Sequence, residues 1–425
     1  MQCSEEALCL TQTPQRIKMP SPARVLALKN PRALSSFFRS PTPSLPTPSP
    51  SPPTPSTSPS SPSRLSMKSI VQDIFNETNF QSLIQKFKSS SRSSRFRCKH
   101  RVYSVTVRRL AAANLHHFVV DIIEHHKQFP EIATEGFAVR LISLYGQAGM
   151  FTDARKLFDE LPQLKCPRTV KSINAVLTAA LDCKLFSKVV ELFDTLPPEI
   201  SVKPDVFSYS ILIQAFCKIG YLDSAISKLE EMELHGVKPC VITFNVLLNG
   251  LYLGDRFSDA EKIWMTMREN NCVPDIISYN ERLRGLVLMG KTDDAVQLFG
   301  ELKSQGLKPN ISSFNSLIRG YCNDGNLEEV KRIFSELANN DCDPNKTSFE
   351  FLIPFACQKG DLDFAVTLCK DCINRRCFVD SGVFQSVIDV LGTESRIKDA
   401  KKLVELAKLK KFFPKSGLRL PSGIE

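Results

Sequence analysis

Residues 206–220 read VFSYSILIQAFCKIG, and the same texture returns 35 residues later as VITFNVLLNGLYLGD in residues 241–255. It returns three more times without a gap, in blocks that begin at residues 276, 311 and 346. A fixed period of this length is the signature of a repeat protein, in which each unit is one small supersecondary element. The internal repeat therefore decides the fold.

Each block opens with an apolar stripe whose members are three or four residues apart. In the first block these are Tyr209, Leu212 and Ile213. This spacing places the side chains on one face of a helix. The equivalent residues of the other blocks are Phe244, Leu247, Leu248, Tyr279, Leu283, Phe314, Leu317, Ile318, Phe349, Leu352 and Ile353. We therefore expect a helix in the first half of every block.

A turn and a second helix complete each block. Four blocks carry a Gly where the first helix must end, which is typical of a C-terminal cap: Gly220, Gly290, Gly325 and Gly360. The second helix has a small residue at Ala225, Ala260, Ala295 or Ala365, and it stops before Pro239, Pro274, Pro309 or Pro344. One such hairpin buries little apolar surface alone, so we expect hairpins to stack on their neighbours and share a core.

The predicted fold class is all-α, a right-handed α-α superhelical solenoid of about nine helical hairpins spanning residues 100–412. The predicted units are 100–134, 135–169, 170–205, 206–240, 241–275, 276–310, 311–345, 346–380 and 381–412. The unit 100–134 lacks the Gly turn, and Pro354 is expected to interrupt the first helix of its unit. Residues 413–425 are predicted to be a C-terminal tail, too short to hold an appended domain.

The N-terminal region has a different composition. Residues 1–66 combine seven basic residues and two acids with a Pro/Ser/Thr-rich tract from Ser40 to Ser63, which predicts an organellar transit peptide and a disordered region. Its Arg content favours the mitochondrion, and the plastid stays open as the alternative. Residues 67–99 are interpreted as a basic arm or linker. The whole basic run, 86–110, either extends the presequence or remains as an arm on RNA.

No metal, cofactor or catalytic site is predicted. Cys369 and Cys372 form a CxxC beside Cys377, but a closed zinc site needs four ligands, and both positions fall on the buried face of a second helix. His116, His117, His125 and His126 have no nucleophile signature near them. The sequence also lacks a long apolar run. We therefore expect a protein that is not an enzyme, with no cofactor, small-molecule substrate or membrane contact.

With this period and the recurring texture V-x-[ST]-[YF]-N…G…A…F…KPD, the chain resembles the P-class pentatricopeptide-repeat family over residues 100–412. The stretch EGFAVRLISLYGQAGMFTDARKLFDELP further resembles short plant mitochondrial members, some of which are associated with the mitochondrial small ribosomal subunit. The resemblance implies one RNA base read per repeat, by the fifth and the last residue of the unit.

Carried over to this sequence, the resemblance implies RNA-binding residues in four pairs. The pairs are Asn174 with Asp205, Asn245 with Asp275, Asn280 with Asn310, and Asn315 with Asn345. The first two resemble pairs that favour uracil, and the other two favour a pyrimidine, usually cytosine. Phe207, Ile242 and Ile277 would wedge between successive bases. The alternative is that these Asn merely begin helices as caps.

Three units depart from the family pattern. Ser210 with Cys240, Val139 with Thr169, and Glu350 with Asp380 match no useful pair. The four readable bases select only roughly one site in 64. The implied partner is pyrimidine-biased single-stranded rRNA or mRNA, presented within an assembly or held by shape and charge.

The predicted function is a single-stranded RNA-binding adaptor in mitochondrial translation, as a component or partner of the small ribosomal subunit and its proteins. A free RNA-processing, stability or translation factor for one organellar transcript is the alternative within the same chemistry. A protein-binding helical-repeat scaffold is the alternative of another class.

Overall fold

The computed structural model describes residues 66–413 and 418–420, which form 21 α-helices, one short 3-10 helix and no β-strand. The transit-peptide prediction for residues 1–66 therefore lies almost wholly outside the described residues. None of the described helices is both long and apolar enough to cross a membrane. The all-helical solenoid predicted from the repeat is confirmed.

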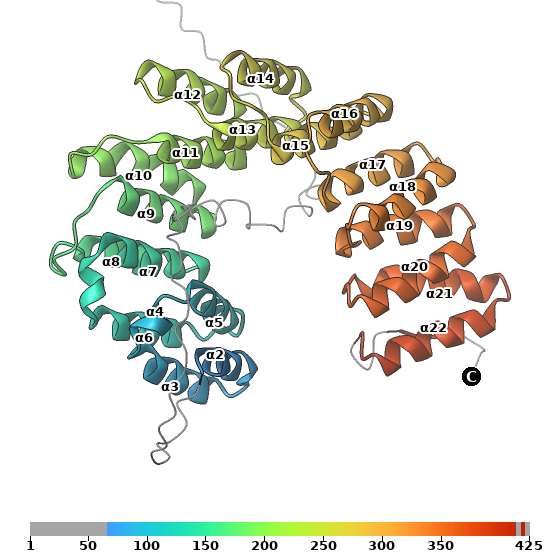
Figure 1. Ribbon diagram of the computed structural model, residues 1–425, viewed down its shortest axis with the longest axis horizontal. Coiled ribbons are helices and arrows are strands. Elements are labelled where there is room, and N and C mark those ends of the chain that lie inside the picture. The colour runs from blue at the N-terminus through green and yellow to red at the C-terminus, as the bar shows by residue number, and fades with distance from the viewer. Residues whose placement is uncertain (1–65, 414–417, 421–425) are drawn as a thin grey trace, which may run out of the picture. The chain divides into compact units, whose positions relative to one another are not determined.

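Each predicted unit contains one pair of helices, and successive hairpins lie side by side (Figure 1). The first helices are α5 (His100–Ala112), α7 (Glu135–Gln147), α9 (Val170–Asp182), α11 (Val206–Ile219), α13 (Val241–Leu253), α15 (Ile276–Leu288), α17 (Ile311–Asn323), α19 (Lys346–Gln358) and α21 (Ser381–Thr393). The second helices are α6 (His116–Lys127), α8 (Phe151–Glu160), α10 (Phe186–Glu199), α12 (Leu222–Leu234), α14 (Phe257–Glu269), α16 (Thr292–Ser304), α18 (Leu327–Asn339), α20 (Leu362–Asn374) and α22 (Ile397–Leu409). The short helix η2 (Pro130–Ala133) follows α6.

Packing runs from each hairpin to the next. Every first helix from α7 to α19 packs against its own second helix and against the following first helix. Edge-to-face aromatic pairs join a second helix to the next first helix: Trp264 meets Tyr279 at 5.4 Å and Phe299 meets Phe314 at 5.3 Å between ring centroids. The apolar stripes predicted from the sequence are buried in this shared core. Stability is therefore distributed along the array, as in other solenoids.

The predicted Gly turns are confirmed by their backbone. Gly220, Gly290, Gly325 and Gly360 have φ between 71° and 95°, the left-handed region that only Gly adopts without strain. Hairpins without this Gly place another residue there: Asn114, Lys184, Asp255 and Ser395 have φ between 57° and 61°. The unit 100–134 thus makes the same turn with Asn114, because Asn tolerates this conformation better than most side chains.

Residues 67–99, expected to be a basic arm or linker, differ from that expectation. They form α2 (Met67–Asn76), α3 (Phe80–Ser91) and α4 (Ser94–Arg97), and α2 and α3 pack on α5 and α6. Leu83, Ile84 and Phe87 are buried in this packing. One arginine of the basic run 86–110 is also engaged within the protein. The guanidinium of Arg109 donates to the carbonyl oxygens of Ile74 at 3.1 Å and of Phe75 at 3.2 Å, at the end of α2.

The expected interruption at Pro354 is also wrong. Helix α19 runs through this residue from Lys346 to Gln358. Pro354 is exposed, so the carbonyl group that loses its helical N–H donor lies on the side of the helix that faces water. The proline ring therefore costs one hydrogen bond and does not end the helix.

Candidate nucleic-acid interface

The four predicted asparagines occupy one equivalent place, the first turn and a half of the first helices α9, α13, α15 and α17. In every case the side-chain Nδ2 donates to the predicted partner at the start of the next first helix. The distances are 2.9 Å from Asn174 to Asp205, 3.0 Å from Asn245 to Asp275, 3.1 Å from Asn280 to Asn310, and 3.2 Å from Asn315 to Asn345. The structure therefore brings together all four pairs chosen from the sequence.

A serine closes each of these contacts. Asn245 Oδ1 accepts from the hydroxyl of Ser278 at 2.6 Å, and that hydroxyl also lies 3.0 Å from Asp275 Oδ1. Ser208, Ser313 and Ser348 do the same in the other three pairs, at 2.6–2.7 Å from the Asn oxygen. Each joint between hairpins is thus tied by an Asn, an Asp or Asn, and a Ser.

The second member of each pair is the N-cap of a helix. Asp275 Oδ1 accepts from the backbone N–H groups of Ile277 and Ser278, at 3.0 and 2.9 Å. The Ser278 hydroxyl returns the contact by accepting from the Asp275 N–H at 3.1 Å, which completes a capping box. Helix capping, the alternative weighed for these residues, accordingly applies to Asp205, Asp275, Asn310 and Asn345 rather than to the four fifth-position asparagines.

Hydrogen-bonding capacity remains after these contacts. An amide has two N–H donors and two acceptor lone pairs, so each Asn keeps one of each. Asp205 and Asp275 make all their contacts through Oδ1, and within residues 66–413 no partner contacts their Oδ2. Asn174, Asn245 and Asn315 are 5–8% exposed. A ligand can therefore reach these groups only edge-on.

The three departing units lack this arrangement. Ser210 is 1% exposed, and its hydroxyl lies 2.9 Å from the Thr243 hydroxyl in place of an amide contact. At the joint after Val139, the carboxylate of Glu135 accepts from the N–H and hydroxyl of Thr169 at 2.9 and 2.8 Å. These two joints present no amide to a ligand.

In the third departing unit, each of the two carboxylates has a partner of its own. Glu350 pairs with Lys346 at 3.5 Å, and Asp380 caps the Gly382 N–H at 2.8 Å. The predicted wedge residues Phe207, Ile242 and Ile277 are partly buried in the first turns of α11, α13 and α15. Their role between bases stays a prediction.

The role of the serines is the part of the arrangement that was not predicted, although Ser or Thr is present in the recurring texture. Ser or Thr recurs at the third position of every unit from 170 to 380, at Ser172, Ser208, Thr243, Ser278, Ser313 and Ser348. All six are buried. A small hydroxyl repeated at a buried place was the available signal, because a buried polar group needs a partner.

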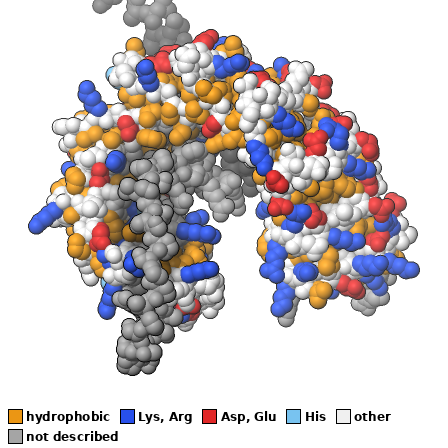
Figure 2. Space-filling model, in the orientation of Figure 1, with side chains coloured by type: hydrophobic (Ala, Val, Ile, Leu, Met, Phe, Trp, Pro, Cys, Tyr) orange, Lys and Arg blue, Asp and Glu red, His pale blue; other side chains and the backbone are white. Residues whose placement is uncertain are grey.

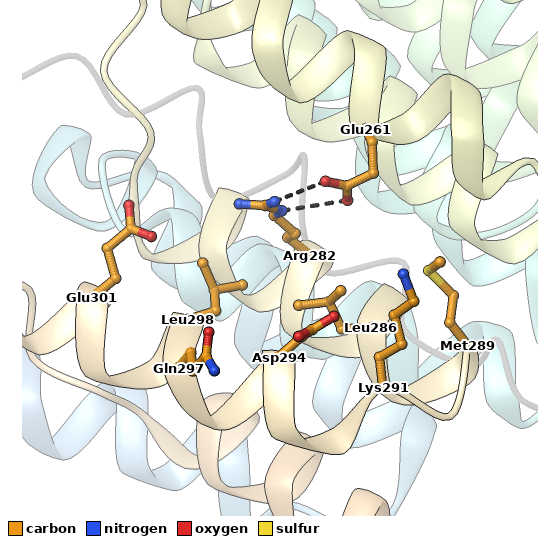
Figure 3. A pocket seen from close by; sticks show the side chains of 9 residues that line it. All are labelled: Glu261, Arg282, Leu286, Met289, Lys291, Asp294, Gln297, Leu298 and Glu301. Atoms are coloured by element: carbon orange, nitrogen blue, oxygen red, sulfur yellow. Dashed lines mark hydrogen bonds and ion pairs between the residues drawn. The ribbon is translucent and has the colours of Figure 1, made fainter.

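A pocket of about 340 Å³ opens elsewhere, between α14 and α16 over α15 (Figure 3). Arg282 donates to Glu261 at 2.7 Å across it, and the guanidinium lies 4.7 Å from the centre of the Trp264 ring. Glu301 on its rim accepts from the Tyr279 hydroxyl at 3.1 Å. None of the four Asn pairs lines this pocket, and of its charged lining residues only Arg282 and Glu261 pair with one another.

The cysteines of the CxxC lie where they were expected, on the buried face of α20. Cys369 and Cys372 are fully buried, and burial raises the pKa of the Cys372 thiol to about 12. Cys372 Sγ lies 3.0 Å from the carbonyl oxygen of Cys377. These thiols therefore pack as small apolar groups.

Comparison with known proteins identifies the repeat. The PPR repeat family model matches residues 204–253, 239–288, 274–323 and 309–358, and a model described as PPR repeat matches residues 140–166. Two similar proteins of Arabidopsis thaliana are the small ribosomal subunit proteins mS78, 45% identical, and mS79, 39% identical, each over 170 residues. The match covers 40% of this chain and 43% of each relative.

A third relative in the same plant, 40% identical over 162 residues, is a pentatricopeptide repeat-containing protein described as mitochondrial; the match covers 38% of this chain and 39% of the relative. Among solved structures, the maize protein PPR10 is 18% identical with a TM-score of 0.47, over 80% of this chain and 53% of that chain. The units matched between residues 204 and 358 carry the apolar stripes, three of the four Gly turns and three of the Asn pairs. The chain therefore contains pentatricopeptide repeats, in residues 140–166 and 204–358.

Proposed function

We propose that this protein is a single-stranded RNA-binding adaptor that acts in mitochondrial translation, as a component or partner of the small ribosomal subunit. The observation that carries the proposal is the fourfold recurrence of one polar arrangement at the joints between first helices. In each, an Asn keeps one free N–H and one free lone pair after linking two hairpins. This is the set of groups needed to pair with the edge of a base.

The partner residue supplies a reason for base preference. Asp205 and Asp275 retain a carboxylate oxygen that can only accept, which suits the N3–H of uracil. Asn310 and Asn345 use their Oδ1 for capping and keep an Nδ2 that no described residue contacts. An N–H donor suits the unprotonated N3 of cytosine. The chemistry therefore supports uracil at the first two joints and cytosine at the other two.

The relatives support a role in the small ribosomal subunit. Two proteins that share 39–45% identity with this chain over 170 residues are small ribosomal subunit proteins. A code of four pyrimidines cannot select one transcript, whereas a binding site presented within a ribosomal particle needs no such selectivity. This favours an adaptor over a free factor.

Binding to short single strands tests the RNA part of the proposal. The full chain is titrated with a uracil-rich and an adenine-rich strand at one stated salt concentration. We expect tighter binding to the uracil-rich strand, and a loss of that preference in the double variant Asn245→Ala, Asn280→Ala. Lys203→Ala, an exposed residue outside the four Asn pairs, is the control. Equal affinity of the wild type for both strands would contradict base reading by these pairs.

Sedimentation of a mitochondrial lysate tests the assembly, with and without ribonuclease. We expect the protein to migrate with the small subunit. A light complex that persists after ribonuclease would instead support a protein-binding scaffold, and a light complex that ribonuclease dissolves would support a free RNA factor.

A further inference from the structure

The last helix of the array, α22, carries a set of unpaired positive charges. Within residues 397–411 there are six lysines and two acids. None of these lysines forms an ion pair with a described residue, and all except Lys401 are exposed. They are Lys398, Lys401, Lys402, Lys408, Lys410 and Lys411. Figure 2 shows basic side chains over this end of the array.

The position of Lys398 is unusual within the repeat. The corresponding residue in four preceding hairpins is acidic: Asp223, Asp293, Glu328 and Asp363. Two of these acids pair with an Arg of the next hairpin, Asp223 with Arg256 at 2.9 Å and Asp363 with Arg396 at 2.6 Å. A cation in the first turn of a helix is disfavoured by the helix dipole. The charge reversal at Lys398 therefore has no explanation in the stability of α22.

The lysine-bearing side is not where another repeat stacks. The apolar face of α22 is already buried, through Ala400, Leu403, Val404 and Ala407. Lys398 and Lys402 lie on the opposite side, about one helical turn apart, and Lys408 continues the exposed surface toward the C-terminal end. Exposed lysines on one helix can each contact a phosphate of a nucleic acid backbone as a point charge.

An aromatic ring accompanies the lysines. Phe378 is 55% exposed, and its ring stacks on that of Phe412 with centroids 4.9 Å apart and planes inclined by 19°. Phe412 is buried and follows Lys411 directly in the chain, so the exposed ring lies at the C-terminal end of the lysine row. A supported ring beside cations is the platform on which an unpaired base stacks. An acidic protein surface would pair with the lysines alone and would not need an exposed aromatic ring.

We infer that the exposed lysines of α22 and the ring of Phe378 form a second RNA-binding surface, for a folded RNA whose stem carries an unpaired nucleotide. The lysines contact the phosphates of the stem, and Phe378 stacks on the unpaired base. This inference extends the proposed function and does not depend on base reading by the four Asn pairs. Such a surface would anchor the protein on structured RNA, independently of single-strand reading.

The test uses the full chain and a short RNA hairpin with one bulged adenine, titrated at several salt concentrations. The triple variant Lys398→Gln, Lys402→Gln, Lys408→Gln should bind the hairpin at least about tenfold more weakly at low salt and reduce the slope of log K against log salt by roughly two to three. The matched control is Lys203→Gln, Lys238→Gln, Lys291→Gln, three exposed lysines elsewhere. It should change neither quantity.

Phe378→Ala tests the stacking separately. It should weaken binding to the bulged hairpin by roughly fivefold or more and leave binding to a fully paired stem and the salt slope unchanged. The inference is overturned if the α22 and control triples behave alike, or if poly-glutamate displaces the hairpin as well as RNA does. Folding of each variant is checked by circular dichroism.

A parallel titration with a uracil-rich single strand separates the two claims. Asn245→Ala, Asn280→Ala should lose single-strand preference and keep hairpin binding, and the α22 triple should do the reverse. If the wild type does not bind the single strand, but the α22 triple variant loses hairpin binding, the proposed base reading fails and this inference stands.

Discussion

His126 is a buried titratable residue in the hairpin of α5 and α6, and its protonation should affect the stability of that hairpin. Its ring is fully buried between α5 and α6, with Nδ1 2.6 Å from the Ile122 carbonyl and Nε2 2.7 Å from the Tyr103 hydroxyl. The carbonyl only accepts, so Nδ1 carries the proton of the neutral ring and Tyr103 donates to Nε2. Burial lowers the pKa of His126 from 6.5 to about 4.

Acid should therefore loosen this hairpin. The unfolded chain binds the proton more readily than the folded chain, so the contribution of the neutral ring is complete above pH 6.5 and is lost as the pH falls toward about 4. The loss is on the order of 3 kcal/mol. Hydrogen exchange of α5 and α6 amides at pH 7 and pH 4.5 measures it. His126→Gln should flatten the pH dependence, and the exposed His117→Gln should not; equal pH dependence in both variants would contradict this assignment.

Ser278 should matter to stability as well as to the interface. Ser278→Ala leaves Asn245 Oδ1 and the Asp275 N–H without their hydroxyl partner at a buried joint, which should cost about 1–3 kcal/mol. Chemical denaturation monitors the loss. Ser227→Ala, exposed in the middle of α12, is the control and should stay within about 0.5 kcal/mol of the wild type. A similarly small change in Ser278→Ala would mean that the joint does not depend on this hydroxyl.

At the scale of helices, close approach between first helices depends on glycines. A Cβ placed on Gly285 of α15 would lie 2.2 Å from the Tyr252 ring of α13, whereas a Cβ on Gly300 of α16 meets nothing within 4 Å. Gly285 thus allows one hairpin to pack closely on the next. Its role could not be read from the repeat pattern, which shows the Gly but not the ring that fills the space above it.

Alanine substitution should affect these two glycines in opposite directions. Gly285→Ala forces the buried Tyr252 ring to move and should destabilise by about 1–3 kcal/mol. Gly300→Ala should stabilise by roughly 0.5–1 kcal/mol, because Ala is the better helix former. Thermal melts of both variants provide the comparison. The packing account fails if Gly285→Ala is as stable as Gly300→Ala.

The helices themselves were predictable wherever the period is regular. The stripes from Tyr209 to Ile353, and the turns at Gly220, Gly290, Gly325 and Gly360, follow from spacing alone. Helices α2 to α4 were not predicted, because a basic composition is more typical of a solvated segment than of a packed helix. Leu83, Ile84 and Phe87 already have helical spacing, but the basic residues around them suggested a solvated arm.

At the scale of the molecule, the buried apolar residues of its described part form two clusters. One spans Ile74 to Met232 and the other Ile213 to Phe412, and they overlap in the hairpin of α11 and α12. The Asn pairs were chosen from the sequence by resemblance, and the structure joins all four by hydrogen bonds. The sequence could not reveal that the same bonds hold the hairpins together. In the proposed function, the residues that read a base are the ones that join the hairpins, so only their unused donors and acceptors would be available to RNA.

We propose that each joint selects a base through the side-chain donors and acceptors that remain free, and Asp275→Asn tests this most directly. Asn caps a helix as well as Asp, so the fold is preserved, while the free acceptor oxygen becomes a free donor. Affinity is measured for two single strands that differ only in uracil or cytosine at the base facing this joint. The wild type should prefer uracil and the variant cytosine, each by roughly tenfold, because a mispaired polar group costs about 1–3 kcal/mol. An unchanged uracil-to-cytosine ratio in the variant would contradict the account.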